Sequence, residues 1–576
     1  MLITRISSWL DSCKTRNRNV GVELSILVVL LSAFSIEMAH VATTLWRRIF
    51  LYDGDSVTLS LIYRSLLQHE PIKWVFSAQM NLFPEGPLYA ISALIGHSVA
   101  TTLLINAALN CLVLYGLIRL FLRVATNFSL LHRQIWGLLT MLTLFALMML
   151  EVPTAQAQTL LTYVLFTTYY DGPLFVGIAL MCFVANQLRQ LPPAITLRSV
   201  LLIVGVVGLE VLTIASNPLY VVQFTIPLLA VLFGLGMFKV IHWRRVTALV
   251  VPHLASVIMG LGLRVPLRGF LGQSTGSHLA SLASLTDWQT SLPFAIKAIN
   301  PLAATTGLHV RVVLIILIYF GGLLSFLLQL NKSQKGPLKP IRPELLFVAT
   351  FIALEPIILI ACLYSGQAVP ERYLIVPTVL TLLFLPLYAD PKQLLGRLQQ
   401  KAAPIITVLS LFILIGGILA LPHLTTLIHG KNIDEQCLAE ALHFKPANGL
   451  SGYWVARTLD VYNVHDERIL QALTGPSVYP WLNNVASYDG KKFSFYVIQR
   501  HLAFTPLFHP LDSLQPAGYT SVSTCQNFYV YHYAPGSIGY NQLNAGMAKS
   551  LHEVEAARKA GKIPELSAKN GQAGKY

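Results

Sequence analysis

The chain has few charged residues. Of its 576 residues only 12% are Asp, Glu, Lys or Arg, whereas 54% are hydrophobic. Ordinary soluble proteins contain about 25% charged residues, and a soluble core could not absorb this much apolar sequence. The composition therefore excludes an ordinary soluble protein and indicates a polytopic membrane protein.

Several sequence motifs are also missing. The sequence has no G-x-x-x-x-G-K-[ST] loop and no helix-opening G-x-G-x-x-G after a strand, so no cytosolic nucleotide site is predicted. Its six cysteines show no C-x-x-C or Cys/His spacing of a zinc site. The absence of a repeat of about 20–50 residues argues against a solenoid.

The positive charges form short clusters between apolar runs. A net charge of +15 could suggest nucleic acid, but clusters of this kind are typical of membrane orientation rather than of a basic groove. We therefore predict no nucleic-acid partner and expect the chain to contact membrane lipid.

About eleven apolar runs have the length of a membrane span. They cover residues 21–46, 98–120, 135–152, 172–188, 199–216, 219–238, 246–263, 310–330, 344–364, 373–389 and 404–422. The predicted cytoplasmic connections carry lysines and arginines, whereas the predicted outer loops 153–171 and 217–218 carry none. This pattern places the N-terminus in the cytoplasm and the C-terminus on the opposite side.

The composition becomes polar and rich in Tyr and Asn after Pro422. We predict a transmembrane domain over 1–423, a small soluble extracytoplasmic α/β domain over 424–540, and a solvated helix with a disordered tail over 541–576. Because Cys437 and Cys525 both fall outside the membrane in this topology, they could form a disulfide.

The first outer loop, residues 47–97, concentrates acidic, aromatic and amide side chains. Asp53 and Asp55 flank a glycine, and a short amphipathic helix is predicted from Ser56 to Gln68. One aspartate could act as a general base while the other caps that helix or binds a cation. Asp55 directly precedes Ser56, so we expect Asp55 to cap the helix and Asp53 to be the base.

The order of the motifs in this loop resembles a known family. The acidic D-x-D motif is followed by an amphipathic helix with Arg64, a polar segment over 73–81 and the sequence FPEGPLY over 83–89. A later segment, PERYLIVP over 370–377, is similar to an R-Y-x-x-P segment of the same family. In this order the motifs resemble the C-type glycosyltransferases, integral membrane enzymes that use sugars carried on polyprenyl phosphate.

The resemblance implies a function. The enzyme would move a sugar, with inversion, from a polyprenyl-phosphate donor to a hydroxyl of a cell-envelope glycan, lipid or protein outside a bacterial plasma membrane. Asp53 or Asp55 would be the base, and Arg372 would bind the donor phosphate. Relatives differ in their use of a divalent cation such as Mg²⁺ or Mn²⁺; its ligands here would be Asp53 and Asp55.

Other polar residues of the predicted outer face are weaker candidates. Arg264 and Arg268 could bind lipid phosphate or could be ordinary loop arginines. The candidates for substrate binding are Tyr373, Glu85, Asp171 and Trp288. Helix capping is an alternative explanation for both Glu85 and Asp171.

Other functions remain open. Glu37, Glu210 and Glu355 fall within or near predicted spans, where ionisable groups are costly and often functional. They support the alternative of a proton-coupled transporter or a lipid or glycan flippase. A third alternative is a non-catalytic scaffold. In the C-terminal region, the aromatic segments 449–457 and 479–484 could bind sugars or could be core aromatics.

Overall fold

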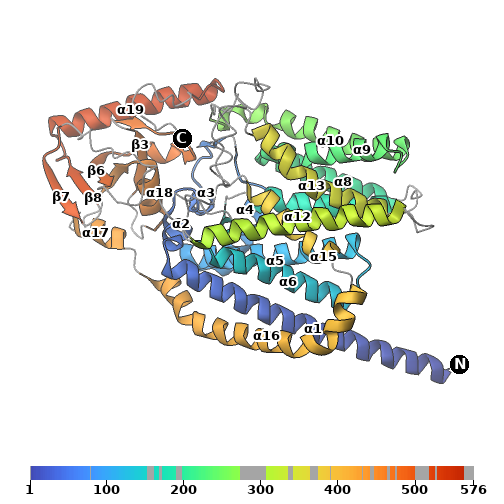
Figure 1. The fold of residues 1–576 in the computed structure, drawn as a ribbon. Coiled ribbons are helices and arrows are strands. Elements are labelled where there is room, and N and C mark those ends of the chain that lie inside the picture. The colour runs from blue at the N-terminus through green and yellow to red at the C-terminus, as the bar shows by residue number, and fades with distance from the viewer. Residues whose placement is uncertain are drawn as a thin grey trace.

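The computed structural model describes most of the chain. The described residues are 2–77, 79–151, 161–167, 171–189, 197–272, 306–334, 342–363, 374–388, 391–430, 433–441, 447–462, 468–473, 476–499, 518–525 and 528–563. A helical bundle leads into a C-terminal domain that contains a β-sheet (Figure 1).

The bundle is built from helices of very different length, from 5 residues in α15 to 42 in α1. They are α1 (Leu2–Thr43), α5 (Val99–Ala125), α6 (Leu130–Met149), α7 (Asp171–Arg189), α8 (Leu197–Ser216), α9 (Ile226–Met237), α10 (Trp243–Leu263), α12 (Thr306–Gln334), α13 (Pro343–Leu363), α14 (Ile375–Leu382), α15 (Phe384–Tyr388) and α16 (Pro391–His429). A short π-helical turn, η2 (Val221–Thr225), continues directly into α9. Each apolar run predicted from the sequence overlaps one of these helical segments.

The helices have the composition of membrane spans. Within the described residues, six helices are long and apolar enough to cross a membrane, and four shorter helices are also apolar. Large apolar side chains face outward from several helices, among them Phe238, Ile258, Phe320, Phe412 and Leu419. A helix that is apolar all round is expected where the surroundings are lipid. The chain is therefore a polytopic α-helical membrane protein.

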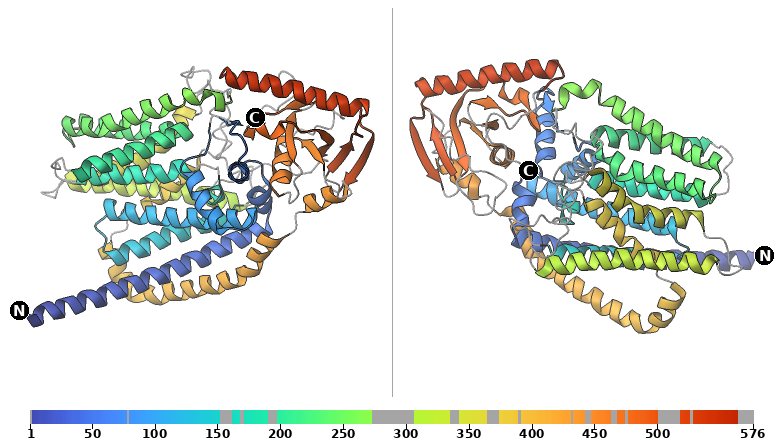
Figure 2. Two further views of the ribbon diagram at one scale, coloured as in Figure 1. Left: turned by 180° about the vertical axis from the view of Figure 1, so that it is seen from behind. Right: turned by 45° about the horizontal axis from the view of Figure 1, so that its top comes forward.

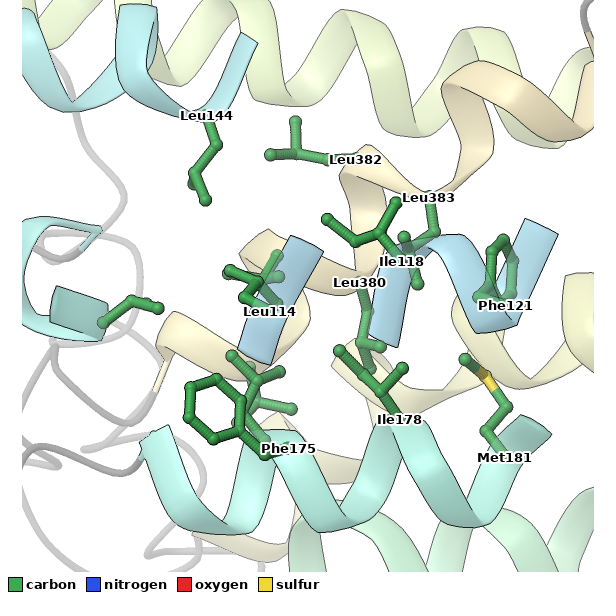
Figure 3. Packing of buried hydrophobic residues seen from close by; sticks show 14 of the residues in the cluster. Leu114, Ile118, Phe121, Leu144, Phe175, Ile178, Met181, Leu380, Leu382 and Leu383 are labelled. Atoms are coloured by element: carbon green, nitrogen blue, oxygen red, sulfur yellow. The ribbon is translucent and has the colours of Figure 1, made fainter. Parts of the chain in front are cut away.

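Side-chain packing holds the bundle together. Leu114 and Ile118 of α5 meet Ile178 of α7 and Leu380 of α14 in a buried cluster (Figure 3). On another side of the bundle α1 and α16 run side by side (Figure 1). There Gly417 packs directly on Ser32, because a Cβ at position 417 would lie only 2.6 Å from that side chain.

Several arginines gather at one end of the bundle. At the end from which the N-terminus projects, Arg189 and Arg342 donate hydrogen bonds to the carbonyls of Arg123 and Ala125 (3.2 and 2.8 Å), and Arg245 donates to that of Gln187. The predicted cytoplasmic loops therefore meet at one end, which we name the basic end. The C-terminal domain sits at the opposite end, here named the domain end (Figure 1).

The C-terminal domain contains a six-stranded sheet. Its strands are β2 (Asn448–Ser451), β3 (Ile469–Leu473), β4 (Ser477–Val478), β6 (Phe493–Gln499), β7 (Ser521–Cys525) and β8 (Phe528–His532), in the order β4-β3-β2-β6-β8-β7. Strand β2 is parallel to both β3 and β6, and the other pairs are antiparallel. The region is thus α/β, as predicted.

Both faces of this sheet are covered by helices. Along β6, Phe495 and Val497 face one core cluster and Tyr496 and Ile498 face the other, as the two-residue period of a strand requires. Helices α17 (Ile433–Ala441) and α18 (Tyr453–Tyr462) cover the first face, and α19 (Ile538–Lys559) covers the second. Figure 2 shows α19, in red, running along its side of the sheet.

Helix α19 differs from the solvated helix expected over 541–576. It begins at Ile538, and its Leu543, Met547 and Val554 are buried against the sheet. These apolar residues are widely spaced among Ala, Lys and Glu, which is why the composition alone suggested a solvated helix. The predicted disordered tail lies mostly in 564–576, outside the described residues.

For the predicted disulfide, the structure describes the side chain of one cysteine only. Cys437 of α17 is disulfide-bonded, and α17 packs on β7, which ends at Cys525. The side chain of Cys525 lies outside the described residues, so the Cys437–Cys525 pairing remains a prediction. Cys111 and Cys182, inside the bundle, are free and buried.

Candidate functional site at the domain end

The acidic turn of the first outer loop connects two short helices. Helix α2 (Trp46–Tyr52) is followed by Asp53 at its C-cap, and α3 (Thr58–Leu67) begins two residues later than the predicted start at Ser56. Trp46 and Phe50 of α2 and Leu59 of α3 are buried in the core of the bundle. The turn over 53–57 is therefore anchored at both ends to the bundle.

The two aspartates make different contacts from those expected. The Asp53 carboxylate accepts a hydrogen bond from the backbone N–H of Asp55 (2.9 Å), so Asp53 stabilises the turn. The N-cap position of α3 belongs to Val57, whose side chain makes no capping hydrogen bond, so Asp55 lies two residues before the cap rather than at it. Which of the two aspartates acts as the base remains a prediction.

The Asp55 carboxylate instead contacts the C-terminal domain. The hydroxyl of Tyr453 in α18 donates a hydrogen bond to Asp55 Oδ1 (2.7 Å). Burial raises the pKa of Tyr453 well above its ordinary value, so at neutral pH this hydroxyl keeps its proton and remains a donor. Arg457, one helical turn along α18, donates from Nε to the carbonyl oxygen of Gly54 (2.8 Å).

Gly54 allows this close approach. A Cβ at position 54 would lie 3.0 Å from the Tyr453 ring and 3.2 Å from the Trp454 ring. Tyr453, Trp454 and Trp481 thus pack against the opening loop, in a cluster that includes Trp74. From the sequence, these aromatic residues could bind sugars or could pack in the core of the C-terminal domain. In the structure they pack between the domain and the opening loop, and sugar binding remains a prediction.

A four-residue charge network joins the loop to the domain. Arg64 of α3 pairs with Asp460 of α18, and Arg468 pairs with both Asp460 and Glu70. We name these four residues the loop–domain network. Burial alone would raise the pKa of Glu70, but hydrogen bonds from Ser65, Arg468 and Ser487 and the charge of Arg468 outweigh it and lower that pKa.

Backbone pairing extends the junction. The two-residue strand β1 (Trp74–Val75) pairs with β5 (Asn483–Asn484) of the domain. Beside β1, Phe76 forms a bridge to Leu271, directly after the 3₁₀ helix η3 (Pro266–Phe270). A cavity of about 20 Å³ remains at this junction, lined by Ser65, Asp460 and Arg468 among others; it has room for a water molecule rather than a sugar.

A second acidic pair lies in the bundle beneath this junction. Glu85 begins α4 (Glu85–Ile95) and Asp171 begins α7, each followed by Gly-Pro-Leu and an aromatic residue. Both carboxyl groups are buried. The Glu85 carboxylate fills the space that a side chain at Gly172 would need, and Asn110 donates to Asp171 Oδ2 (3.0 Å). Burial raises the pKa of Glu85.

The arginines near η3 lie at the same end of the molecule. Arg264 donates from Nη1 to the carbonyl of Ala215 (2.7 Å) at the end of α8, so this arginine has a structural contact. Arg268, within η3, is exposed. The bridge from Leu271 to Phe76 connects η3 directly to the opening loop.

Some predicted residues cannot be placed. Arg372, Tyr373 and Trp288 lie outside the described residues. Within the described ranges no three His, Cys, Asp or Glu side chains come together to hold a metal ion. Mg²⁺ usually binds through one or two carboxylates together with phosphate and water, so Asp53 and Asp55 would be the protein's ligands for a phosphate-bound cation.

The three glutamates within the apolar helices, Glu37, Glu210 and Glu355, differ in their contacts. Glu210 of α8 contacts His253 Nδ1 (2.7 Å) and accepts from the Tyr220 hydroxyl (3.5 Å). Glu37 and Glu355 are fully buried, and their carboxylate oxygens have no hydrogen-bond partner among the described residues.

Comparisons with known proteins find a likeness among solved structures. No family model matches the sequence, and no curated protein matches it. Among solved structures, ArnT from Cupriavidus metallidurans bound to undecaprenyl phosphate is similar, with a TM-score of 0.46 and 13% sequence identity over 91% of this chain and 98% of that chain.

Sequence reasoning missed how the site is assembled. Asp53, Asp55 and the GLSGYWVAR segment were each singled out, but their contact was not predicted. The one charged residue of that segment, Arg457, was the available signal, because an arginine in a mostly apolar stretch often has a partner elsewhere.

Proposed function

We propose that the chain is a membrane glycosyltransferase that moves a sugar from a polyprenyl-phosphate donor to a hydroxyl of an acceptor. The carrying observation is the Asp53-Gly54-Asp55 turn, which lies where the apolar bundle meets the polar domain, with Asp55 oriented by Tyr453. A donor with a lipid tail and a charged head would place its reacting carbon at such a boundary. The motif order of the first outer loop supports the same class of enzyme.

We assign the general base to Asp55. Asp53 is engaged in the turn, whereas Asp55 is half-buried and held by a tyrosine hydroxyl, an arrangement that orients a catalytic carboxylate. The acceptor hydroxyl would transfer its proton to Asp55 as its oxygen bonds to the anomeric carbon. The bond from that carbon to the phosphate oxygen breaks with its electron pair, so polyprenyl phosphate leaves and the configuration inverts.

The leaving phosphate needs positive charge, because negative charge grows on it as the bond breaks. Arg268 is an exposed cation on η3, which is bridged to the opening loop. We propose Arg268 as one phosphate ligand and Arg372 as another. Arginine suits this role because its planar guanidinium can donate two parallel hydrogen bonds to phosphate oxygens.

The proposal also fixes how the protein is oriented in the membrane. The domain end would face the outside of a bacterial plasma membrane, because the basic end carries the positive loops that favour the cytoplasm. The acceptor would be a glycan, lipid or protein of the cell envelope. A divalent cation held at this turn through Asp53 would neutralise phosphate charge and leave Asp55 as the base.

Reconstitution tests the proposed function. Purified protein in liposomes is given a synthetic polyprenyl phosphate with a radiolabelled sugar and a cell-envelope fraction as acceptor. We expect label in the acceptor together with free polyprenyl phosphate. Glu553→Gln, at an exposed position of α19, should transfer sugar at the wild-type rate. Absence of both products with every sugar class would remove the proposal.

A transporter or flippase is the second candidate. Its support is the burial of Glu37 and Glu355 without hydrogen-bond partners among the described residues. The same liposomes separate the two functions. Movement of solute or lipid that depends on a pH gradient, without sugar transfer, would favour the transporter.

A further inference from the structure

Arg457 is a buried cation without a carboxylate partner among the described residues. Its side chain is only 3% exposed. It donates to three neutral oxygens: the carbonyl of Gly54 (2.8 Å), the hydroxyl of Thr58 (2.7 Å) and the carbonyl of Leu482. Burial of an unpaired guanidinium is costly unless hydrogen bonds and nearby negative charge compensate. Two of these three contacts lie on the acidic turn or on the first residue of α3.

A chain of contacts runs from Arg457 to Asp55. The guanidinium lies over the Tyr453 ring, 5.0 Å from its centre, which is within the range of a cation–π contact. The hydroxyl of the same tyrosine donates to Asp55. Arg457 thus supports Tyr453 from one side of the ring, and Tyr453 fixes one oxygen of the Asp55 carboxylate.

The turn has little freedom to move between these groups. Its backbone is closed by hydrogen bonds from Val57 N to Asp53 O (3.2 Å) and from Thr58 N to Asp55 O (3.1 Å). On the outside, Gly54 packs against Tyr453, Trp454 and Arg457. The conformation that presents Asp55 therefore depends on side chains that are far away in the sequence and belong to another domain.

We propose that Tyr453 and Arg457 are positioning residues, and that the membrane site is complete only when the C-terminal domain is docked on the first outer loop. The ordering of the turn stands on the contacts above, whereas its effect on sugar transfer rests on the proposed function. A base has to be held within about 0.5 Å of its productive position, and an error of about 1 Å can cost roughly 100-fold in rate.

Amide hydrogen exchange tests the ordering without any need for activity. The full-length protein in detergent micelles is compared with Arg457→Ala, Arg457→Lys and Tyr453→Phe. We expect peptides covering 53–58 to exchange faster in Arg457→Ala by roughly 10- to 100-fold, the effect of losing one or two charge-assisted hydrogen bonds. Arg457→Lys should recover only part of the protection, because an ammonium group cannot reach three separated oxygens.

Kinetics test the consequence for the reaction. For Arg457→Ala we expect kcat to fall about 100-fold, and for Tyr453→Phe about 10-fold, the loss of one hydrogen bond. The KM for the donor should stay within about twofold in both, because neither residue is proposed to bind the donor. Lys492→Ala, an exposed position beside β6, is the matched control for the loss of a positive side chain.

Each outcome decides the proposal. Unchanged exchange over 53–58 in Arg457→Ala would overturn it, and so would faster exchange with wild-type kcat. If Arg457→Ala does not fold, Tyr453→Phe, which removes the hydrogen bond to Asp55, and Thr58→Val, which removes those to Gly54 and from Arg457, give the same readouts. If the wild-type protein transfers no sugar, the proposed function fails, while the exchange data still decide whether Arg457 orders the turn.

Discussion

The loop–domain network predicts that replacement of Arg468 by Met will destabilise the C-terminal domain. Arg468 donates to both oxygens of Asp460 (2.9 and 3.2 Å) and to Glu70. Its side chain is 14% exposed, and those of Asp460 and Glu70 are 6% and 17% exposed. Methionine keeps the apolar stem but leaves Glu70 without a cation, and Asp460 with Arg64 alone.

The size of the effect follows from this burial. Breaking a fully buried ion pair by removing one partner costs about 3–5 kcal/mol. Because these groups keep some solvent contact, and Glu70 retains three neutral donors, we expect about 3 kcal/mol. For a domain of this size, about 1 kcal/mol corresponds to roughly 4 °C. The Tm should therefore fall by about 12 °C.

Tryptophan fluorescence can follow the unfolding, because Trp74, Trp454 and Trp481 lie at the junction. The protein is heated in detergent micelles at neutral pH, with Lys492→Ala as the control. In a Glu70→Gln background the Arg468→Met substitution should cost less, since no buried charge is left unpaired there. A fall of less than about 4 °C, or equal costs in the two backgrounds, would refute this reasoning.

Three further predictions concern other parts of the molecule. Burial raises the pKa of Glu85 above its ordinary value of 4.5, so its contribution to stability is fully present below that value and is lost as the pH rises through the raised pKa. The Tm of the wild type should therefore fall between about pH 5 and 8, and Glu85→Gln should flatten this fall. Parallel curves of Tm against pH for the two proteins would contradict this. Reduction of the disulfide at Cys437 should cost the domain about 2–5 kcal/mol, and non-reducing peptide mapping should find Cys525 as its partner rather than another cysteine. Arg268→Ala should weaken donor binding by about 10- to 100-fold through the loss of one or two charge-assisted hydrogen bonds, measured against Lys562→Ala; equal affinities would exclude Arg268 as a phosphate ligand.

Much of the helical architecture could be predicted because membrane spans depend on local properties. A run of about 20 apolar residues is long enough to cross a bilayer, and each predicted run falls on a helix. The clustering of arginines at the basic end followed from the same reasoning. The packed helix α19 was missed because its buried residues, such as Leu543 and Val554, are sparse among polar neighbours.

The site could be predicted only in part. The sequence identified the acidic turn, but α3 begins at Thr58 rather than Ser56, so Asp55 does not stand at the expected cap position. Helix boundaries are uncertain by this amount when only sequence is available. Asp55 and Tyr453 are separated by 398 residues in the sequence, and no local pattern reports such a pairing.

The closeness of Glu85 and Asp171 was not predicted from the sequence. Both residues precede Gly-Pro-Leu and an aromatic residue, so the sequence contained a repeated helix-start pattern. Each was considered as a cap of its own helix, and the Glu85 carboxylate also lies beside Gly172 at the start of α7. Which helix a terminal carboxylate serves depends on how the helices pack, which the pattern does not contain.

The most direct test of the account is single-turnover sugar transfer by Asp55→Asn. The protein is loaded with labelled polyprenyl-phosphate sugar, donor binding is verified, and the rate of transfer to a cell-envelope acceptor is compared with that of the wild type and of Asp53→Asn. Because a general base contributes about 10²- to 10⁴-fold, the account predicts at least a 100-fold loss in folded, donor-bound Asp55→Asn and a smaller loss in Asp53→Asn. Transfer by Asp55→Asn at the wild-type rate would contradict it.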